Sequence, residues 1–445
     1  MSLARVIEDS KTLPSEELGR FRVDGVRPKA VVVPESAEEV AGILKMASEE
    51  GLAVTPWGGG TMMSLGGIPK KIDLVLLLRN LNRIVEYSPE ELVVTAEAGI
   101  TLGNLQSALA KKNQFLALDP PCASDATLGG IVASNSFGPI CHVYGRIRDL
   151  MLGIRVANPG GSLTGFGGRV VKNVAGYDMK KLYVGSLGTL GVAVQTTFRL
   201  HPIPRFERTL ISVFDVLGDF AKASRELLNS SHSSVGIGPS AVEGLDPNSF
   251  TILAGDSLSI PQNYVLAVRV AGMTQKAVEE RVSELERIVR KHNSIATLPA
   301  GNSLHETLWK RIVQYSELSC EKFPIRIKVS TLISKVADVM NATREISERE
   351  GLEHSIVAHM GLGIIHIYFS SANPDRVSSA TKELRSFVLG IGSASSLVVE
   401  AAATDVKQRI DVWGPVRSDF FLMRAVKDRF DPKGILNPGR FVGGI

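Results

Sequence analysis

Residues 56–67 read PWGGGTMMSLGG and directly follow a short apolar segment, AVT at 53–55. Glycine lacks a Cβ, so a run this dense lets another group come close to the backbone. The run ends a predicted strand–helix–strand unit: a strand at 30–33, a helix that begins after Ser36 and ends at Gly51, and a strand at 52–55. Ser36 and Glu39, three residues on, predict a capping box at the start of that helix. Backbone N–H groups in such a loop can bind an anion. A plain glycine turn between strands is the alternative, and this stretch alone does not decide between them.

Two familiar nucleotide-binding loops do not fit this stretch. A Rossmann fingerprint needs GxGxxG opening a helix, and Met63 stands where the third glycine belongs. Pro69 and the two lysines that follow it also argue against a helix starting there. A P-loop needs Gly-Lys-Ser or Gly-Lys-Thr, and the sequence contains neither. If the loop binds a phosphate, it does so in another way.

Composition narrows the class of protein. A chain of 445 residues is too long for one hydrophobic core, so we expect two or three domains. The net charge of +4 is small, and no Lys/Arg block indicates nucleic-acid binding. The three cysteines lie far apart, without the spacing of a haem or iron–sulfur site. We therefore predict no nucleic-acid partner and no such redox centre on this chain.

Location is an expectation from what the sequence lacks. The first residues, MSLARVIEDS, have no apolar signal segment, and no apolar run approaches the roughly 20 residues that span a bilayer. Sparse cysteine fits a reducing compartment. We expect a cytoplasmic protein, and peripheral contact with the inner face of a membrane stays open.

The rest of the chain changes character twice. Residues 119–200 are glycine-rich with short elements, which suggests backbone packed closely against a large flat ligand. After HPIPR at 201–205 glycine thins out, and strands alternate with amphipathic helices, which indicates a separate α+β domain. The predicted helices there lie near 217–229, 274–291, 334–349 and 375–388, and the predicted strands near 264–271, 325–330, 363–369 and 396–400.

Several motifs together resemble one family. They are PWGGGT at 56–61, LGG at 128–130 with Asn135, YGR at 144–146 with Asp149, KNVAGYDMKKLYVGSLGTLGV at 172–192, and FDPKGILNPGRF at 430–441. The chain resembles the vanillyl-alcohol-oxidase superfamily with its PCMH-type FAD domain, and within it the FAD-linked D-lactate dehydrogenases and glycolate oxidase FAD-binding subunits. The resemblance implies an α+β fold: a two-lobed FAD-binding domain over 1–205, a cap domain with an antiparallel sheet over 206–415, and a segment over 416–445 that returns to the FAD domain.

The resemblance also implies which residues bind FAD. The glycine loop would hold the pyrophosphate through main-chain N–H groups, and later small residues would line the rest of the coenzyme. The FAD should be non-covalent, because the loop 56–64 has no His or Cys to tether it; Cys122 and His142 lie elsewhere. The implied set is Pro56, Gly58, Gly59, Gly60, Thr61, Met62, Ser64, Pro121, Thr127, Gly129, Gly130, Ser134, Asn135, Gly138, Gly145, Arg146, Gly188, Val192 and Asn437.

A second motif, HMGLGIIH from His359 to His366, points to the substrate. One histidine ends a predicted strand and the other lies in the next, so a hairpin would bring both rings together. One buried and one surface histidine is the plain alternative. Relatives carry HxGDGNxH here and a downstream Glu-His-Gly, which implies a divalent metal, Zn or Mn, on His359, His366 and Glu400. Leu362 and Ile364 replace the Asp and Asn of that motif.

The identity of the general base is open as well. Ala401 and Ala402 replace the His-Gly that follows the glutamate in relatives, and that histidine is the family's base. Without a metal, His366 would take the proton.

Two arginines are candidates for the substrate carboxylate. A guanidinium binds a carboxylate with two parallel hydrogen bonds, which a lysine does less well. Relatives place a basic residue at the positions of Arg311 and Arg326, and Arg326 lies within an apolar strand pattern. A surface role is the alternative for either. Tyr368 follows His366 by two residues, on the same face of its predicted strand, and could reach the same pocket.

The resemblance implies FAD-dependent oxidation of a small D-2-hydroxy acid, with D-lactate converted to pyruvate. The electrons would leave to an external acceptor such as a quinone, a cytochrome or a dye. The main alternative is a non-catalytic FAD-carrying subunit of a glycolate oxidase complex, which leaves partner subunits open. An alcohol or sugar oxidase of the same superfamily is a third reading, weakened by an aromatic content of only 6%.

Overall fold

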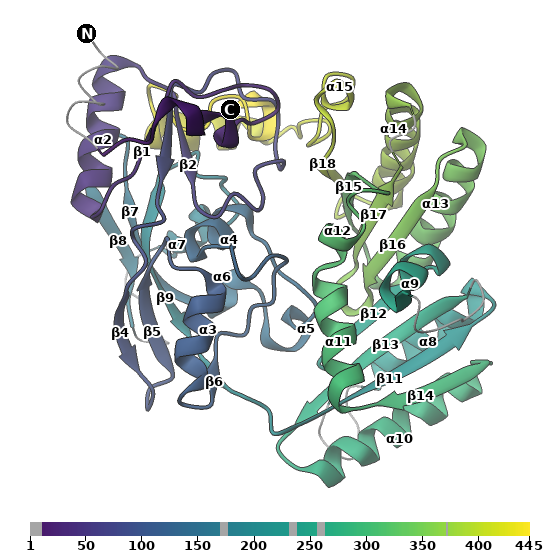
Figure 1. Cartoon of the computed structure of the whole chain (residues 1–445). Helices are drawn as coiled ribbons and strands as arrows, with labels where there is room; N and C mark the ends of the chain where they lie inside the picture. The colour runs from purple at the N-terminus through teal and green to yellow at the C-terminus, as the bar shows by residue number, and fades with distance from the viewer. Residues whose placement is uncertain (1–10, 170–176, 231–237, 256–262, 371–372) are drawn as a thin grey trace. The chain divides into compact units, whose positions relative to one another are not determined.

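The structure is a computed structural model that describes residues 11–169, 177–230, 238–255, 263–370 and 373–445. The chain forms two compact units, which are described separately below (Figure 1). Unit 1 comprises the described residues of Met1–Phe137, Gly145–Ile203 and Pro415–Ile445, and unit 2 comprises those of Gly138–Tyr144 and Pro204–Gly414. The KNVAG part of the 172–192 motif lies outside the described residues.

Unit 1 holds both glycine-rich regions. Its elements in chain order are η1 (Ser15–Phe21), β1 (Ala30–Val32), α2 (Ala37–Glu50), β2 (Val54–Trp57), β3 (Leu74–Leu77), β4 (Ile84–Ser88), β5 (Val93–Glu97), α3 (Leu102–Ala110), β6 (Gln114–Phe115), α4 (Leu128–Ser134), α6 (Ile147–Leu150), β7 (Met151–Ala157), β8 (Leu163–Gly167), α7 (Lys180–Tyr183), β9 (Val192–Arg199), β10 (His201–Pro202), α16 (Phe420–Phe430) and η5 (Val442–Gly444).

The predicted strand–helix–strand unit is confirmed, with one difference at the start of its helix. Strands β1 and β2 both pair in parallel with β3, and α2 ends at Gly51, whose φ is 67°. Ser36 Oγ accepts from the backbone N–H of Glu39 at 3.1 Å, as a cap should. The Glu39 carboxylate, however, accepts from the N–H of Glu35, so the reciprocal half of the capping box lies one residue earlier than predicted.

The C-terminal segment completes unit 1 beside β2. Val54 N–H donates to the carbonyl of Ile435 at 2.8 Å, and Asn437 N–H donates to the carbonyl of Val54 at 2.9 Å. The buried ammonium of Lys427 contacts Asp431 Oδ2 at 2.6 Å and the carbonyl of Thr189 at 2.9 Å. These bonds attach the C-terminal segment to β2, which leads into the glycine loop, and to the 185–191 region. A separate sheet, in the order β4-β5-β9-β7-β8, is antiparallel throughout.

Unit 2 is built on one large sheet. Its elements are α5 (Cys141–Tyr144), β11 (Phe206–Phe214), α8 (Leu217–Asn229), β12 (Ala241–Leu245), α9 (Pro247–Ala254), β13 (Tyr264–Gly272), α10 (Gln275–Lys291), β14 (Ala296–Ala300), α11 (Asn302–Val313), α12 (Tyr315–Leu318), β15 (Ile325–Ser330), η3 (Ile333–Lys335), α13 (Val336–Glu350), β16 (His354–His359), η4 (Met360–Leu362), β17 (Ile364–Phe369), α14 (Pro374–Ile391), β18 (Ser396–Ala401) and α15 (Thr404–Lys407).

The sheet of unit 2 has eight antiparallel strands in the order β14-β11-β13-β12-β16-β17-β15-β18 (Figure 1). Alternate side chains point to opposite faces. On β13, Leu266, Val268 and Val270 join the core under α8, α10, α13 and α14. Val265 and Ala267 join the core under α9, α11 and α12. Both faces are therefore buried, which explains the nearly continuous apolar runs of the central strands.

The predicted mixed α+β architecture with an antiparallel second sheet is confirmed. No helix in the described part of the chain combines the length and the apolar composition that crossing a bilayer requires.

Candidate functional site

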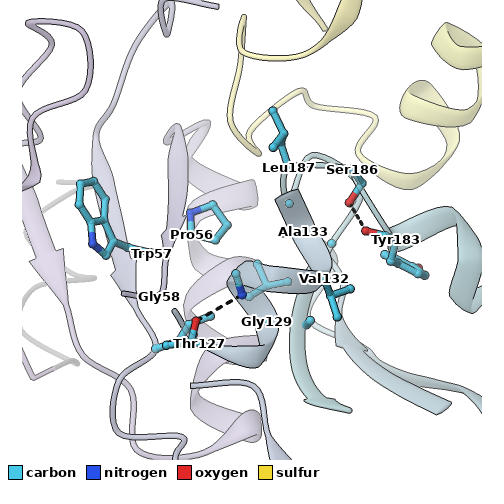
Figure 2. A pocket seen from close by; sticks show the side chains of 16 residues that line it. Pro56, Trp57, Gly58, Thr127, Gly129, Val132, Ala133, Tyr183, Ser186 and Leu187 are labelled. Carbon is cyan, nitrogen blue, oxygen red and sulfur yellow. Dashed lines mark hydrogen bonds between the residues drawn. The ribbon is translucent and has the colours of Figure 1, made fainter. Parts of the chain in front are cut away.

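Two adjoining cavities that open to solvent lie beside the glycine loop of unit 1. The cavities share walls, so they form one continuous candidate site between the glycine loop, α4 and the 186–188 turn (Figure 2). The shared residues are Pro56, Gly58, Thr127, Gly130, Ala133 and Leu187.

Contacts within the protein explain why this loop consists of glycine. A Cβ on Gly58 would lie 2.1 Å from Thr127 Oγ1, and a Cβ on Gly59 would lie 1.8 Å from the carbonyl oxygen of Asp125. Thr127 begins α4, where its Oγ1 accepts from the N–H of Gly130 at 3.3 Å. The loop thus packs directly on the start of α4, and both backbones face the cavity.

Two buried polar atoms in the cavity walls fit a hydrogen-bonding ligand. Asn437 Oδ1 and Tyr183 OH find no hydrogen-bond partner within the described residues. The amide nitrogen of Asn437 is already used, because it donates to the carbonyl of Leu187 at 2.6 Å. Burial raises the pKa of Tyr183 to about 12, so its hydroxyl stays a donor. A ligand with hydroxyl and ring-nitrogen groups, such as FAD, would satisfy both atoms.

Arg440 supports the loop from the C-terminal segment. Its guanidinium is buried and donates to the carbonyl oxygens of Met63 and Leu65. Burial lowers the pKa of Arg440 to about 10. Since two backbone carbonyls take its donors, we assign it to shaping the cavity wall.

Most of the residues predicted to bind FAD lie in these walls. The structure places there Pro56, Gly58, Gly59, Gly60, Thr61, Met62, Thr127, Gly129, Gly130, Ser134, Gly188, Val192 and Asn437.

Six predicted residues do not line the two cavities: Ser64, Pro121, Asn135, Gly138, Gly145 and Arg146. Asn135 ends α4 in the left-handed conformation, with φ at 52°. Gly145 also has a positive φ, 87°, two residues before α6, and Gly138 falls in unit 2. The turn-forming character of Asn135 and Gly145 therefore has a structural cause, and the contact of all six residues with FAD stays a prediction.

The sequence interpretation missed other wall residues, including Trp57, Tyr183, Ser186, Leu187 and Arg440. The signal for Tyr183, Ser186 and Leu187 was available, because these residues lie inside the LYVGSLG motif that supported the resemblance. Arg440 follows Asn437 by three residues in the NPGR motif, but only the fold shows that it reaches the glycine loop.

A row of polar side chains crosses one face of the unit 2 sheet, and we call it the Glu400 cluster. Strand register creates it: Lys328 on β15 pairs with His366 on β17, and His359 on β16 pairs with Glu243 on β12. The β15–β18 pairing shifts at Arg326/Ile327, where Glu400 is the additional residue. The cluster consists of Glu243, Arg326, Lys328, His359, His366 and Glu400.

Glu400 is the centre of this cluster. Its Oε1 lies 3.0 Å from Lys328 Nζ, and its Oε2 lies 3.2 Å from Arg326 Nε and 3.5 Å from His366 Nδ1. Burial would raise the pKa of Glu400, but Lys328 and Arg326 hold it well below its ordinary value. Burial lowers the pKa of His366 to about 4, against the effect of Glu400. Near neutral pH, Glu400 is therefore an anion and His366 an uncharged ring.

The predicted hairpin of the two histidines is confirmed, because β16 and β17 pair and the ring centroids lie 5.2 Å apart. The metal predicted on His359, His366 and Glu400 is not supported. Among the described residues, no group of three or more His, Cys, Asp or Glu side chains could hold a metal ion. The physical reason is that the Glu400 carboxylate already binds two cations, Arg326 and Lys328. We therefore derive no step through a metal.

The other two predicted catalytic residues have different surroundings. Arg311 donates from Nε and Nη2 to the carbonyls of Leu253 and Ile252, at 2.7 and 2.8 Å, and so caps the end of α9. We expected its guanidinium to face a substrate carboxylate; these two bonds favour a structural role, and contact with the substrate stays a prediction. Tyr368 lies on the same face as Arg326 and packs edge-on against Tyr315, with ring centroids 5.0 Å apart. Burial raises its pKa, so it stays protonated.

Lys328 and Glu243 are members of the cluster that the sequence interpretation did not single out. The alternation in IRIKVS puts Lys328 on the same face as Arg326, which was a usable signal. Glu243 is the only charged residue of the strand AVEGL and is almost fully buried, but its partner becomes visible only in the sheet.

Comparison with known proteins agrees with both units. The family described as FAD binding domain matches residues 28–167, and the family described as FAD linked oxidases, C-terminal domain, matches 203–396 and 416–441. Together these matches span most of the chain.

Individual relatives cover nearly its whole length. The glycolate oxidase subunit GlcD of Bacillus subtilis is 28% identical over 93% of this chain and 88% of its own. A D-lactate dehydrogenase of Archaeoglobus fulgidus is 28% identical over 93% of this chain and 91% of its own. The structure of p-cresol methylhydroxylase is similar with a TM-score of 0.74, over 99% of this chain and 95% of that protein, at 17% identity. The chain belongs to the FAD-linked oxidases: the match to the FAD-binding domain contains most of the glycine-lined cavity, and the match to the C-terminal domain covers most of unit 2.

Proposed function

We propose that this FAD-linked oxidase oxidises a small D-2-hydroxy acid, with D-lactate converted to pyruvate. The observation that supports this best is the position of Arg326, in the Glu400 cluster beside an uncharged histidine. The Arg326 side chain is 12% exposed, and a guanidinium in such partly desolvated surroundings binds a carboxylate strongly. The similar glycolate oxidase subunit and D-lactate dehydrogenase support the same class of substrate.

His366 is the base in this proposal. Its Nδ1 faces Glu400 Oε2, so we assign the ring proton to Nδ1 and leave Nε2 as the acceptor. Nε2 would take the proton of the 2-hydroxyl group while C2 loses a hydride, which gives the 2-oxo acid. The Glu400 anion would then stabilise the imidazolium that forms.

The coenzyme supplies the redox chemistry. The glycine loop, Thr127 and Asn437 would hold FAD, which would supply the acceptor for the hydride. The electrons would then leave to an external acceptor such as a quinone or a cytochrome. The residues of this chain orient the acid and move its hydroxyl proton. A cytoplasmic location belongs to the same proposal.

Anaerobic reduction of the purified, FAD-loaded protein tests this function. D-lactate should bleach the flavin absorbance without a partner subunit, and L-lactate should not. Arg326→Ala should lower kcat/KM about 10²–10³-fold, equal to about 3–4 kcal/mol, with unchanged FAD content. Arg349→Ala is a matched control, because Arg349 pairs with Glu383 on the surface of the same unit. Full activity of Arg326→Ala would remove Arg326 from the carboxylate role.

The alternative of a non-catalytic FAD-carrying subunit has its own supporting observation. Leu362, Ile364 and Ala401 stand where the resembled motif has Asp, Asn and His. In that case no 2-hydroxy acid of a D- and L-panel would reduce the flavin until a partner subunit is added.

A further inference from the structure

Lys328 enters the Glu400 cluster through the register of two neighbouring strands. On β15 it points to the same face as Arg326, and across the sheet it pairs with His366. The additional residue on β18 inserts the Glu400 carboxylate between the two cations, with one oxygen toward each. The Lys328 side chain keeps 21% of its surface exposed, so it is paired with Glu400 without being fully enclosed.

This arrangement conflicts with metal binding at one specific atom. A zinc ligand oxygen lies about 2.0–2.2 Å from the ion. Lys328 Nζ lies only 3.0 Å from Glu400 Oε1, so a divalent cation there would meet an ammonium of like charge. His359 turns its Nδ1 to Glu243, as metal-bound histidines often do toward a carboxylate. Both oxygens of Glu400, however, face a cation, because Arg326 Nε lies 3.2 Å from Oε2. Lys328 is the cation that stands at Oε1.

We propose that Lys328 acts in place of a metal, as a substrate-binding residue whose ammonium contacts the oxygens of the 2-hydroxy acid. This inference rests on the proposed function, because it concerns the same substrate. An ammonium has three donors, and among the described contacts of Lys328 one direction is taken, by Glu400. Glu400 fixes the side chain, and the remaining donors can bind a carboxylate or hydroxyl oxygen. Binding of the substrate is then independent of divalent metal.

Calorimetry of pyruvate binding to the FAD-loaded full chain tests the role of Lys328. Pyruvate is the 2-oxo acid and does not react further, so binding alone is measured. Wild-type protein treated with EDTA should bind pyruvate as before, and added Zn²⁺ or Mn²⁺ should not change the Kd. Lys328→Met should weaken binding at least tenfold, because it removes the ammonium and keeps a side chain of similar length. Lys328→Arg, which keeps the charge, should stay within a few fold, still without metal. Lys322→Met is the control, because Lys322 pairs with Glu353 at the surface of the same unit.

Two results would overturn the inference. In the first, EDTA abolishes pyruvate binding and added Zn²⁺ or Mn²⁺ restores it. This result comes from the wild-type protein, so it does not depend on whether a variant folds. The other is unchanged pyruvate binding by a Lys328→Met protein of normal FAD content. Failure of the proposed function looks different: no 2-hydroxy acid would reduce the flavin, while metal-independent pyruvate binding through Lys328 could still be observed.

Discussion

Both carboxylate oxygens of Glu243 lie 2.8 Å from Nδ1 of His359, between two neighbouring strands of the unit 2 sheet. The two side chains are 1% and 7% exposed. Burial raises the pKa of Glu243, and His359 opposes that rise. The pair fixes the His359 ring and with it one end of the Glu400 cluster, because the His359 ring also packs edge-on against His366.

Removing this carboxylate should destabilise the protein. Glu243→Ala breaks a buried pair, which typically costs about 3–5 kcal/mol, whereas Glu243→Gln keeps shape and an acceptor and should cost about 1–2 kcal/mol. Urea unfolding of the FAD-loaded protein measures both. Glu353→Ala, at an exposed ion pair, should stay within about 0.5 kcal/mol of wild type. Equal stability of Glu243→Ala and Glu353→Ala would refute a structural role for the pair.

The pKa of His366 predicts a pH dependence of stability. Its pKa falls from 6.5 to about 4 on folding, so between these values the unfolded chain binds a proton that the folded chain does not. The folded state should therefore lose up to about 3 kcal/mol as the pH falls from 6.5 to 4. His366→Gln lacks this contribution. The difference in unfolding free energy between the wild type and His366→Gln should therefore shrink as the pH falls from 6.5 to 4. Asp246, whose pKa is raised to about 6, acts in the opposite direction but is present in both. A constant difference would contradict the assigned burial of His366.

A methyl group in the glycine loop should weaken FAD binding. Gly59→Ala would place Cβ 1.8 Å from the backbone oxygen of Asp125, so the loop or α4 must move. We expect FAD affinity to fall at least tenfold, about 1.4 kcal/mol, measured as quenching of flavin fluorescence on titration of apoprotein. Gly160→Ala is the control, because an added Cβ there meets nothing within 4 Å. If both variants bind FAD like wild type, the packing of the loop on α4 does not shape the site.

Arg311 should behave as a structural residue. Arg311→Lys keeps the charge but cannot cap both the Leu253 and Ile252 carbonyls from one planar group. We expect a loss of roughly 1–3 kcal/mol in unfolding free energy with little change in KM for D-lactate. Steady-state kinetics beside thermal unfolding separates the two effects. A many-fold rise in KM at unchanged stability would return Arg311 to the carboxylate site.

Local features of the sequence predicted much of what the structure shows. Three features follow from short-range spacing: the α2 helix with Ser36 and Gly51 at its ends, the His359–His366 hairpin, and the alternation of apolar and polar side chains on the strand that contains Arg326. Such patterns work because helix caps and strand alternation depend on residues a few positions apart. The glycine loop also lies in a cavity wall as predicted, although its glycines are required by Thr127 and Asp125.

The sequence by itself determined the class of fold and the resemblance to FAD-linked oxidases, and it gave the substrate residues only as candidates. Only the tertiary structure decided their partners: the shift at the edge of the sheet brings Glu400 between Arg326 and Lys328, and helix packing turns Arg311 toward α9. Glu400 is 72 residues from Lys328 in sequence (400 − 328), so no local pattern reports their contact. Whether a carboxylate binds a metal or an ammonium depends on such distant pairings, since charges interact through space and not along the chain.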